Sequence, residues 1–122
     1  MATRPVSLLF AKKKCSSCEG GVQPLTRKQA LDFLTQIDGW SLSERSDAIC
    51  REYRMRDFMA AVKFIGCVAK LAEKEDHHPD IHLTSYRKLK IDLSTHAIGG
   101  LSENDFILAA KIDKLPESLI IK

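Results

Sequence analysis

The chain has 122 residues, of which 44% are hydrophobic and 29% are charged, a length and balance typical of one globular domain with a single apolar core. Its net charge of +3 does not indicate direct binding to nucleic acid, because nucleic-acid-binding proteins usually carry a concentrated basic face. No apolar run approaches the length of a membrane-spanning helix, so we expect no association with a membrane.

We interpret residues 1–24 as an N-terminal extension or linker and residues 25–122 as the domain. A glycine pair, Gly20-Gly21, and Pro24 break the chain between the two parts. The first 18 residues contain basic side chains and no acidic one, a composition found in targeting segments as well as in solvated extensions. The expected location is therefore the cytoplasm, or an organelle such as the mitochondrion if this segment is a targeting sequence.

The cysteines indicate neither a disulfide framework nor a complete zinc site. Cys15 and Cys18 form one Cys-x-x-Cys pair, but the second pair that a zinc site needs is missing. Cys50 lies in a strand-like run and Cys67 in a helix-like one, where each is expected to be a small, partly buried side chain. We therefore expect no metal, and reduced thiols.

The first predicted elements are a helix and a hairpin. Thr26 and Gln29 have the spacing of a capping box, which predicts a helix that begins there and ends at Asp38-Gly39. Two extended runs follow, Trp40–Leu42 and Ile49–Met55, with a polar turn-like segment between them. These runs predict an antiparallel pair of strands.

The longest predicted helix comes next, with Asp57 as its N-cap and an end near Glu75. Apolar residues recur at helical spacing over this range, and Pro79 cannot continue a helix. A strand is expected from Ile81 to Tyr86, followed by a fourth strand in which Leu89, Ile91 and Leu93 alternate with polar residues.

A last helix should begin after the chain break at Gly99-Gly100, framed by Ser102 and Asp105. The resulting order is α-β-β-α-β-β-α, which predicts an α+β fold. We expect one four-stranded antiparallel sheet with three helices on one face. The other face and an edge strand would then be available to a partner chain.

All the histidines of the chain lie between positions 77 and 96: His77, His78, His82 and His96. Histidine gains and loses protons near neutral pH more readily than any other side chain, so the group is a candidate for acid–base chemistry. Glu73 precedes His77 by four residues and is close enough on a last helical turn to orient that imidazole. His96 is expected to end the fourth strand.

Plainer interpretations compete with this one. Adjacent histidines can simply flank a turn closed by Pro79, and His82 can face solvent from its strand. A zinc site from His77, His82 and His96 is conceivable, but the proline between the first two prevents a standard helical ligand face. Trp40 is more often a core residue than a platform for a substrate.

The spacing of these residues resembles a known signature. The array contains Glu73, His77-His78-Pro79, Tyr86, His96 and Asp105. A second stretch contains Leu93-Ser94-Thr95-His96 and then Gly100-Leu101-Ser102-Glu103. Both are similar to the pterin-4a-carbinolamine dehydratases, as are Gly39-Trp40 and Asp47-Ala48-Ile49 at the first hairpin. The resemblance covers about Leu25 to Lys114.

This resemblance implies a reaction and a set of roles. The family removes the 4a-hydroxyl group of a hydroxylated tetrahydropterin as water, which regenerates the cofactor of aromatic amino acid hydroxylases, and it needs neither a metal nor an organic cofactor. By matched position, His77, His78 and His96 would be the family's catalytic histidines. His77 and His96 would transfer protons, and His78 would lie against the substrate and help to hold its 4a-hydroxyl region. The remaining residues expected at the substrate are Glu73, Pro79, Thr95, Ile98, Asp105 and Trp40.

Two further functions belong to other classes. Some relatives bind a transcription factor through a helix surface, so this chain could be a binding module that acts as a dimerisation cofactor. It could also be an assembly factor that has retained the pocket. The resemblance further implies a homodimer or a homotetramer built through helix and edge-strand contacts.

Overall fold

The structure is a computed structural model that describes residues 23–121. The predicted extension lies almost wholly outside this range, as do Cys15 and Cys18. The regular elements are α2 (Arg27–Leu34), β1 (Ser41–Leu42), β2 (Ile49–Arg54), α3 (Phe58–Glu75), β3 (Asp80–Thr84), β4 (Lys88–Leu93) and α4 (Glu103–Ile112), with short 3₁₀ helices η1 (His96–Ile98) and η2 (Glu117–Leu119). Within the described residues no helix is long and apolar enough to cross a membrane.

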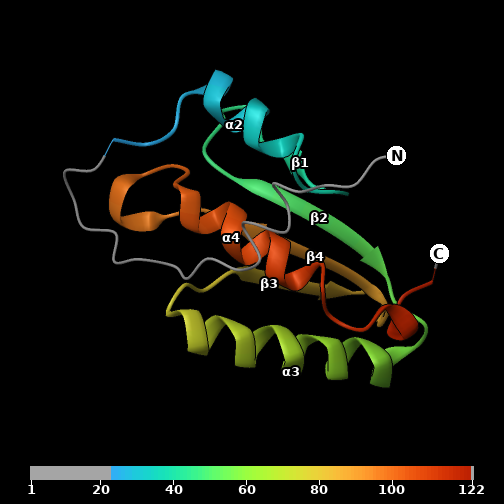
Figure 1. The fold of residues 1–122 in the computed structure, drawn as a ribbon. Coiled ribbons are helices and arrows are strands. Elements are labelled where there is room, and N and C mark those ends of the chain that lie inside the picture. Colours follow the sequence, from blue (N-terminus) through green and yellow to red (C-terminus); the bar gives the residue numbers. More distant parts are fainter. Residues whose placement is uncertain (1–22, 122) are drawn as a thin grey trace.

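The strands form one antiparallel sheet in the order β1-β2-β4-β3. Helices α2, α3 and α4 all lie on one side of it (Figure 1). On that side Ile49, Leu89, Ile91 and Leu93 are buried, whereas the alternate residues of the strands face outward, as the two-residue period of a strand requires. The predicted α+β class and element order are confirmed.

Local hydrogen bonds fix where the helices begin. Thr26 and Gln29 form the predicted capping box at α2. The Asp57 carboxylate accepts a hydrogen bond from the backbone N–H of Ala60 at 2.7 Å and so caps α3. Ser102 and Asp105 form a second capping box at the start of α4. All three helix starts therefore lie where the sequence predicts them.

The ends of β3 and β4 differ from the prediction. β3 ends at Thr84 instead of Tyr86, because Ser85 and Tyr86 adopt left-handed backbone conformations that form the turn to β4. β4 ends at Leu93, so His96 does not end a strand but begins η1. A backbone bridge between Thr95 and Gly100 closes this loop and turns the chain out of the sheet.

Candidate active site

One rim of the sheet gathers the predicted site residues. β3 and β4 are antiparallel, and Asp80 lies opposite Asp92. Continuing this register outward places the segment 77–79 beside the segment 93–95, since each step along one strand is matched by a step back along the other. The chain thus brings the His-His-Pro segment next to Thr95 and the loop that carries His96.

The end of α3 determines where the two adjacent histidines point. Asp76 adopts the left-handed conformation (φ 53°), and the backbone N–H of His77 donates to the carbonyl of Ala72 at 3.2 Å. This type of helix ending turns the chain sharply away from the helix axis. As a result, the His77 side chain contacts α4 while His78 turns back to α3.

Asp105 connects both sides of the rim and is fully buried. Its Oδ1 lies 2.6 Å from Nε2 of His77. Its Oδ2 accepts hydrogen bonds from the Thr95 hydroxyl at 2.8 Å and from the backbone N–H of Ser102 at 3.0 Å. These donors, together with the position of Asp105 in the first turn of α4, compensate a buried negative charge.

The hydroxyl groups around Asp105 form an ordered chain. The Thr95 hydroxyl has only one proton, and it donates that proton to Asp105. The contact of 2.7 Å between the Thr95 and Ser102 hydroxyl oxygens must therefore have Ser102 as its donor. Because an ionised carboxylate can only accept hydrogen bonds, a neutral His77 facing an ionised Asp105 carries its proton on Nε2 and presents Nδ1 as a base.

His78 is bound differently. Its Nε2 lies 2.7 Å from Oε2 of Glu73, and both side chains are largely exposed, at 54% and 78%. The expectation that Glu73 orients His77 is therefore wrong, because the left-handed residue at position 76 rotates His77 toward Asp105. Glu73 and Asp105 each hold one histidine, so both carboxylates still lie at the predicted site.

His96 lies on the same rim, exposed at the start of η1. It lines a small hollow of about 260 Å³ together with Asp47, Ser94 and Thr95. Ile98 is half-buried in η1, and Pro79 is half-buried before β3. The structure brings Thr95 to His96 and, through Asp105, to His77.

Trp40 belongs to a different cluster. Its indole Nε1 donates to the carboxylate of Asp113 at 3.0 Å, and Arg51 binds the same oxygen at 2.6 Å. Asp113 follows Asp105 by eight residues along α4, which corresponds to roughly 12 Å. The structure therefore does not bring Trp40 into hydrogen-bonding contact with the histidine rim.

Burial dominates the electrostatics of this second cluster. It raises the pKa of Asp113 from 3.8 to about 6, against the opposing effects of the Trp40 and Arg51 hydrogen bonds and the Arg51 charge. Burial also raises the pKa of Tyr53, whose ring lies 4.7 Å from the Arg51 guanidinium carbon. No pattern in the sequence indicated this cluster, because Trp40 and Asp113 are 73 positions apart.

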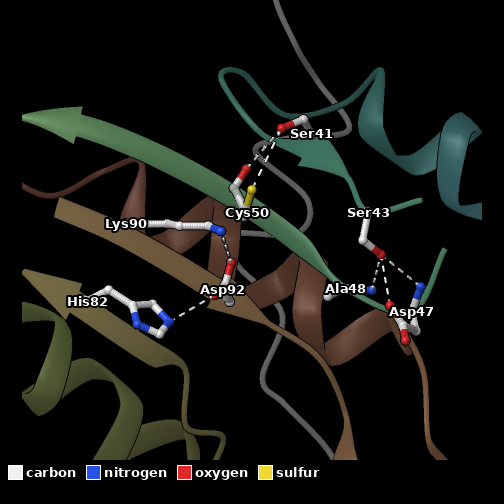
Figure 2. Close-up of polar contacts among 8 residues, drawn as sticks. All are labelled: Ser41, Ser43, Asp47, Ala48, Cys50, His82, Lys90 and Asp92. Atoms are coloured by element: carbon white, nitrogen blue, oxygen red, sulfur yellow. Dashed lines mark hydrogen bonds and ion pairs between the residues drawn. The ribbon is translucent and has the colours of Figure 1, made fainter. Parts of the chain in front are cut away.

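His82 lies on the outer face of the sheet, away from the helices. Its Nε2 is 3.1 Å from Oδ2 of Asp92, and Lys90 lies on the other side of that carboxylate (Figure 2). The interpretation of His82 as a solvent-facing histidine agrees with this position. Within residues 23–121 no three His, Cys, Asp or Glu side chains are grouped as they would be to hold a metal ion.

Sequence reasoning missed two residues of the rim. Ser102 was recognised as a helix cap, and it also supplies a hydroxyl and a backbone N–H to the network around Thr95 and Asp105. Asp47 was noted only as part of a hairpin motif, although it lines the hollow beside His96. The available signals for Ser102 were its capping-box pattern and its place in the Gly100-Leu101-Ser102-Glu103 stretch that resembles the family.

The fold and the rim define a small α+β protein in which each of two adjacent histidines lies against a carboxylate and a third histidine lies on the same rim. The chain belongs to the pterin 4 alpha carbinolamine dehydratase family, whose model matches residues 23–115.

Sequence matches to individual relatives support this assignment to the family. A protein of Halorhodospira halophila is 48% identical to this chain over 103 residues, and the match covers 84% of this chain and 94% of the relative. That relative is itself only provisionally named a pterin-4-alpha-carbinolamine dehydratase. The Arabidopsis thaliana protein named pterin-4-alpha-carbinolamine dehydratase 2, mitochondrial, is 44% identical over 87% of this chain and 58% of its own length.

Solved structures share the fold. A Brucella melitensis protein titled transcriptional coactivator/pterin dehydratase has a TM-score of 0.69 and 33% identity, over 75% of this chain and 96% of that one. A pterin dehydratase-like protein titled as a RuBisCO assembly factor in the α-carboxysome has a TM-score of 0.52 and 18% identity, over 62% of this chain and 86% of that one. The second likeness concerns the fold alone.

Proposed function

We propose that this protein is a 4a-hydroxytetrahydrobiopterin dehydratase, which eliminates water to give the quinonoid dihydropterin and so recycles the cofactor of aromatic amino acid hydroxylases. The observation that carries the proposal is the Asp105 carboxylate, which holds His77 on one side and Thr95 on the other. This arrangement presents a ring nitrogen of fixed tautomer close to the loop of His96, as an acid–base pair requires.

The proposed reaction divides into two proton transfers. One histidine, protonated, donates to the 4a-hydroxyl oxygen as the bond between that oxygen and carbon 4a breaks, and water leaves. The other histidine, neutral, accepts the proton from the ring N–H as the C=N bond forms. We assign these transfers to His77 and His96, and the reaction is balanced without a cofactor.

The remaining rim residues would bind and position the pterin. His78, held by Glu73, is exposed enough to contact the 4a-hydroxyl region. Pro79, Thr95 and Ile98 would border the ring. We leave Trp40 out of this group because its indole N–H is already bonded to Asp113.

A single set of variants tests the proposal. The His77→Ala protein should dehydrate freshly generated 4a-hydroxytetrahydropterin about 10²- to 10⁴-fold more slowly than the wild type, the range that general acid–base groups contribute. The His82→Ala protein is the matched control, because His82 also pairs with a carboxylate but lies on the outer sheet face. Equal rates for His77→Ala and wild type would refute the assignment.

A second function is favoured by the outer surface of α3. Phe58, Met59 and Val62 are 51%, 72% and 45% exposed there, and Gly66 leaves open space one turn further along. Such a surface is typical of protein interfaces. We propose that it joins copies of this chain into a dimer or tetramer, or docks a helix of a partner protein, as the coactivator title of the Brucella relative suggests.

For the cellular location we propose the cytoplasm or the mitochondrion. The mitochondrial Arabidopsis relative and the basic composition of residues 1–18 support the second. A fluorescent fusion of the full chain, compared with one that lacks residues 1–22, tests it: the mitochondrial signal should be lost with the segment.

A further inference from the structure

A second hollow lies far from the histidine rim, on the outer face of the sheet at the β3–β4 turn. Its volume is about 870 Å³. Its lining contains one carboxylate, Glu52, and several cationic side chains. The cations are Arg54, Arg87, Lys88 and Lys90. The hollow lies at the end of β3 and β4 opposite to His77 and His96, so it is separate from the proposed active site.

Two of these cations repel each other. Arg54 and Lys88 are direct cross-strand partners, and both side chains point to the outer face. Directly opposite side chains lie only about 5 Å apart at their Cβ atoms, so like charges in such a pair are destabilising. Within the described residues neither side chain has an acidic partner at ion-pair distance.

The neighbouring cations are already engaged. The Lys90 ammonium nitrogen lies 3.9 Å from Oδ1 of Asp92. Figure 2 shows the two side chains pointing toward each other. Arg87 donates to the carbonyl of Met55 at 3.1 Å, and its guanidinium lies 5.7 Å from the ring centre of Tyr86. For the other two lining cations, Arg54 and Lys88, the described residues provide no ion pair within 4.0 Å, and Glu52 is the one carboxylate beside them.

The backbone of the same turn is strained. Ser85 and Tyr86 have φ values of 47° and 54°, a conformation that favours glycine or asparagine and that neither of these residues adopts readily. This turn holds the Tyr86 ring 56% exposed at the margin of the hollow. Strain and unrelieved charge at one place are typical of a binding site, where a ligand offsets the local cost.

We propose that this hollow binds a phosphate-bearing aromatic ligand, of which a nucleoside monophosphate is the simplest example. The phosphate group lies between Arg54 and Lys88, where it neutralises both charges, and guanidinium groups match phosphate oxygens particularly well. The planar base stacks on the exposed Tyr86 ring. Two free cations suit a single phosphate group better than a long polyanion, which needs a longer basic track.

Calorimetric titration of the full chain with AMP at low ionic strength tests the proposal. Arg54→Gln and Lys88→Gln should each weaken binding about tenfold, the effect of losing one charge-assisted hydrogen bond. Lys63→Gln is the matched control, because it removes an exposed lysine from α3 on the other side of the sheet. Absence of saturable binding, or equal affinities for Arg54→Gln and wild type, would overturn the proposal.

Titration with inorganic phosphate distinguishes recognition of the phosphate group from recognition of the aromatic base. Tyr86→Ser should weaken AMP binding and leave phosphate binding unchanged. If phosphate binds as tightly as AMP and Tyr86→Ser affects neither, the hollow does not recognise an aromatic ligand and the proposal fails.

Thermal unfolding tests the repulsion between Arg54 and Lys88 without any ligand. Lys88→Gln should raise the melting temperature at low ionic strength, and the gain should disappear at 1 M salt because screening removes the repulsion. A lower melting temperature for Lys88→Gln would show that the charge is compensated. The dehydration rate of these variants should stay at the wild-type value.

Discussion

At the scale of single residues, the buried Asp105 carboxylate is the centre of the hydrogen-bond network at the candidate active site. We expect Asp105→Asn to keep the shape of the side chain but to remove the charge that accepts from His77, Thr95 and Ser102. The His77 imidazole then loses its fixed tautomer. The dehydration rate should fall by up to about 10²- to 10⁴-fold, the range that a general acid–base group contributes when it is correctly oriented. Substrate binding should change less.

This expectation has a clear control. Asp92→Asn removes the carboxylate that binds His82 on the outer sheet face and should leave the dehydration rate unchanged. If both variants lose activity equally, the effect of Asp105→Asn is not specific to the His77 contact.

Asp113 makes stability depend on pH. Its pKa is raised from 3.8 to about 6 in the folded protein, so the folded state binds this proton more tightly than the unfolded state does. Its contribution to stability is therefore fully present below pH 3.8 and is lost as the pH rises through 6. The loss amounts to up to about 3 kcal/mol, since one pKa unit corresponds to about 1.4 kcal/mol.

Asp113→Asn isolates this effect. The asparagine keeps an oxygen for Trp40 and Arg51 but cannot titrate. The free energy of unfolding of the wild type, minus that of the variant, should fall between pH 4 and pH 7 in urea titrations. A difference that rises over this range would mean that the ion pair with Arg51, and not burial, dominates the pKa of Asp113.

At the scale of elements, a buried ion pair ties α3 to α4. The Lys111 ammonium lies 2.7 Å from Oε2 of Glu75, and these side chains are only 17% and 2% exposed. Glu75 ends the helix that leads to His77, and Lys111 lies on the helix that carries Asp105. The pair therefore helps to hold the two sides of the His77 contact in register.

Removing one partner of this pair should be costly. Lys111→Met removes the ammonium group that lies 2.7 Å from the buried Glu75 carboxylate, and loss of one partner of a buried pair typically costs about 3–5 kcal/mol. The double variant Glu75→Leu, Lys111→Met should recover most of that loss. Urea denaturation measures all three proteins, and a single variant as stable as the wild type would contradict this description of the pair.

The elements also show what a sequence can predict. Capping residues such as Thr26, Asp57 and Ser102 act within three or four positions, so the helix starts followed from local patterns. The pairing of His77 with Asp105 could not be predicted in this way, because it depends on the left-handed backbone at Asp76 and joins residues 28 positions apart. Trp40 was expected near the substrate from the family resemblance, whereas the fold bonds its indole N–H to Asp113, at the opposite end of α4 from Asp105.

At the scale of the whole molecule, the two sides of the domain have different surfaces. The first turns of α3 expose the apolar side chains of Phe58, Met59 and Val62, whereas the outer face of the sheet is charged and polar. The apolar surface should therefore mediate self-association, and the charged one should remain in solvent or bind ions.

Sedimentation tests the apolar surface. Val62→Lys should shift the protein to a smaller species, because burying a lysine in an apolar interface is unfavourable. Leu31→Lys on α2 is the control, since Leu31 is 44% exposed and Val62 is 45% exposed. A wild-type protein that sediments only as a monomer, or equal shifts in both variants, would contradict the assignment of α3 as the interface.

The most direct test of the central claim is the dehydration rate of freshly generated 4a-hydroxytetrahydropterin, with no protein, with the wild type and with His96→Ala. We predict rapid loss of the substrate with the wild type and a rate at least about 100-fold lower with a folded His96→Ala protein. A folded wild-type protein that does not accelerate the dehydration would contradict the proposed enzyme and leave the binding function of α3 as the better explanation.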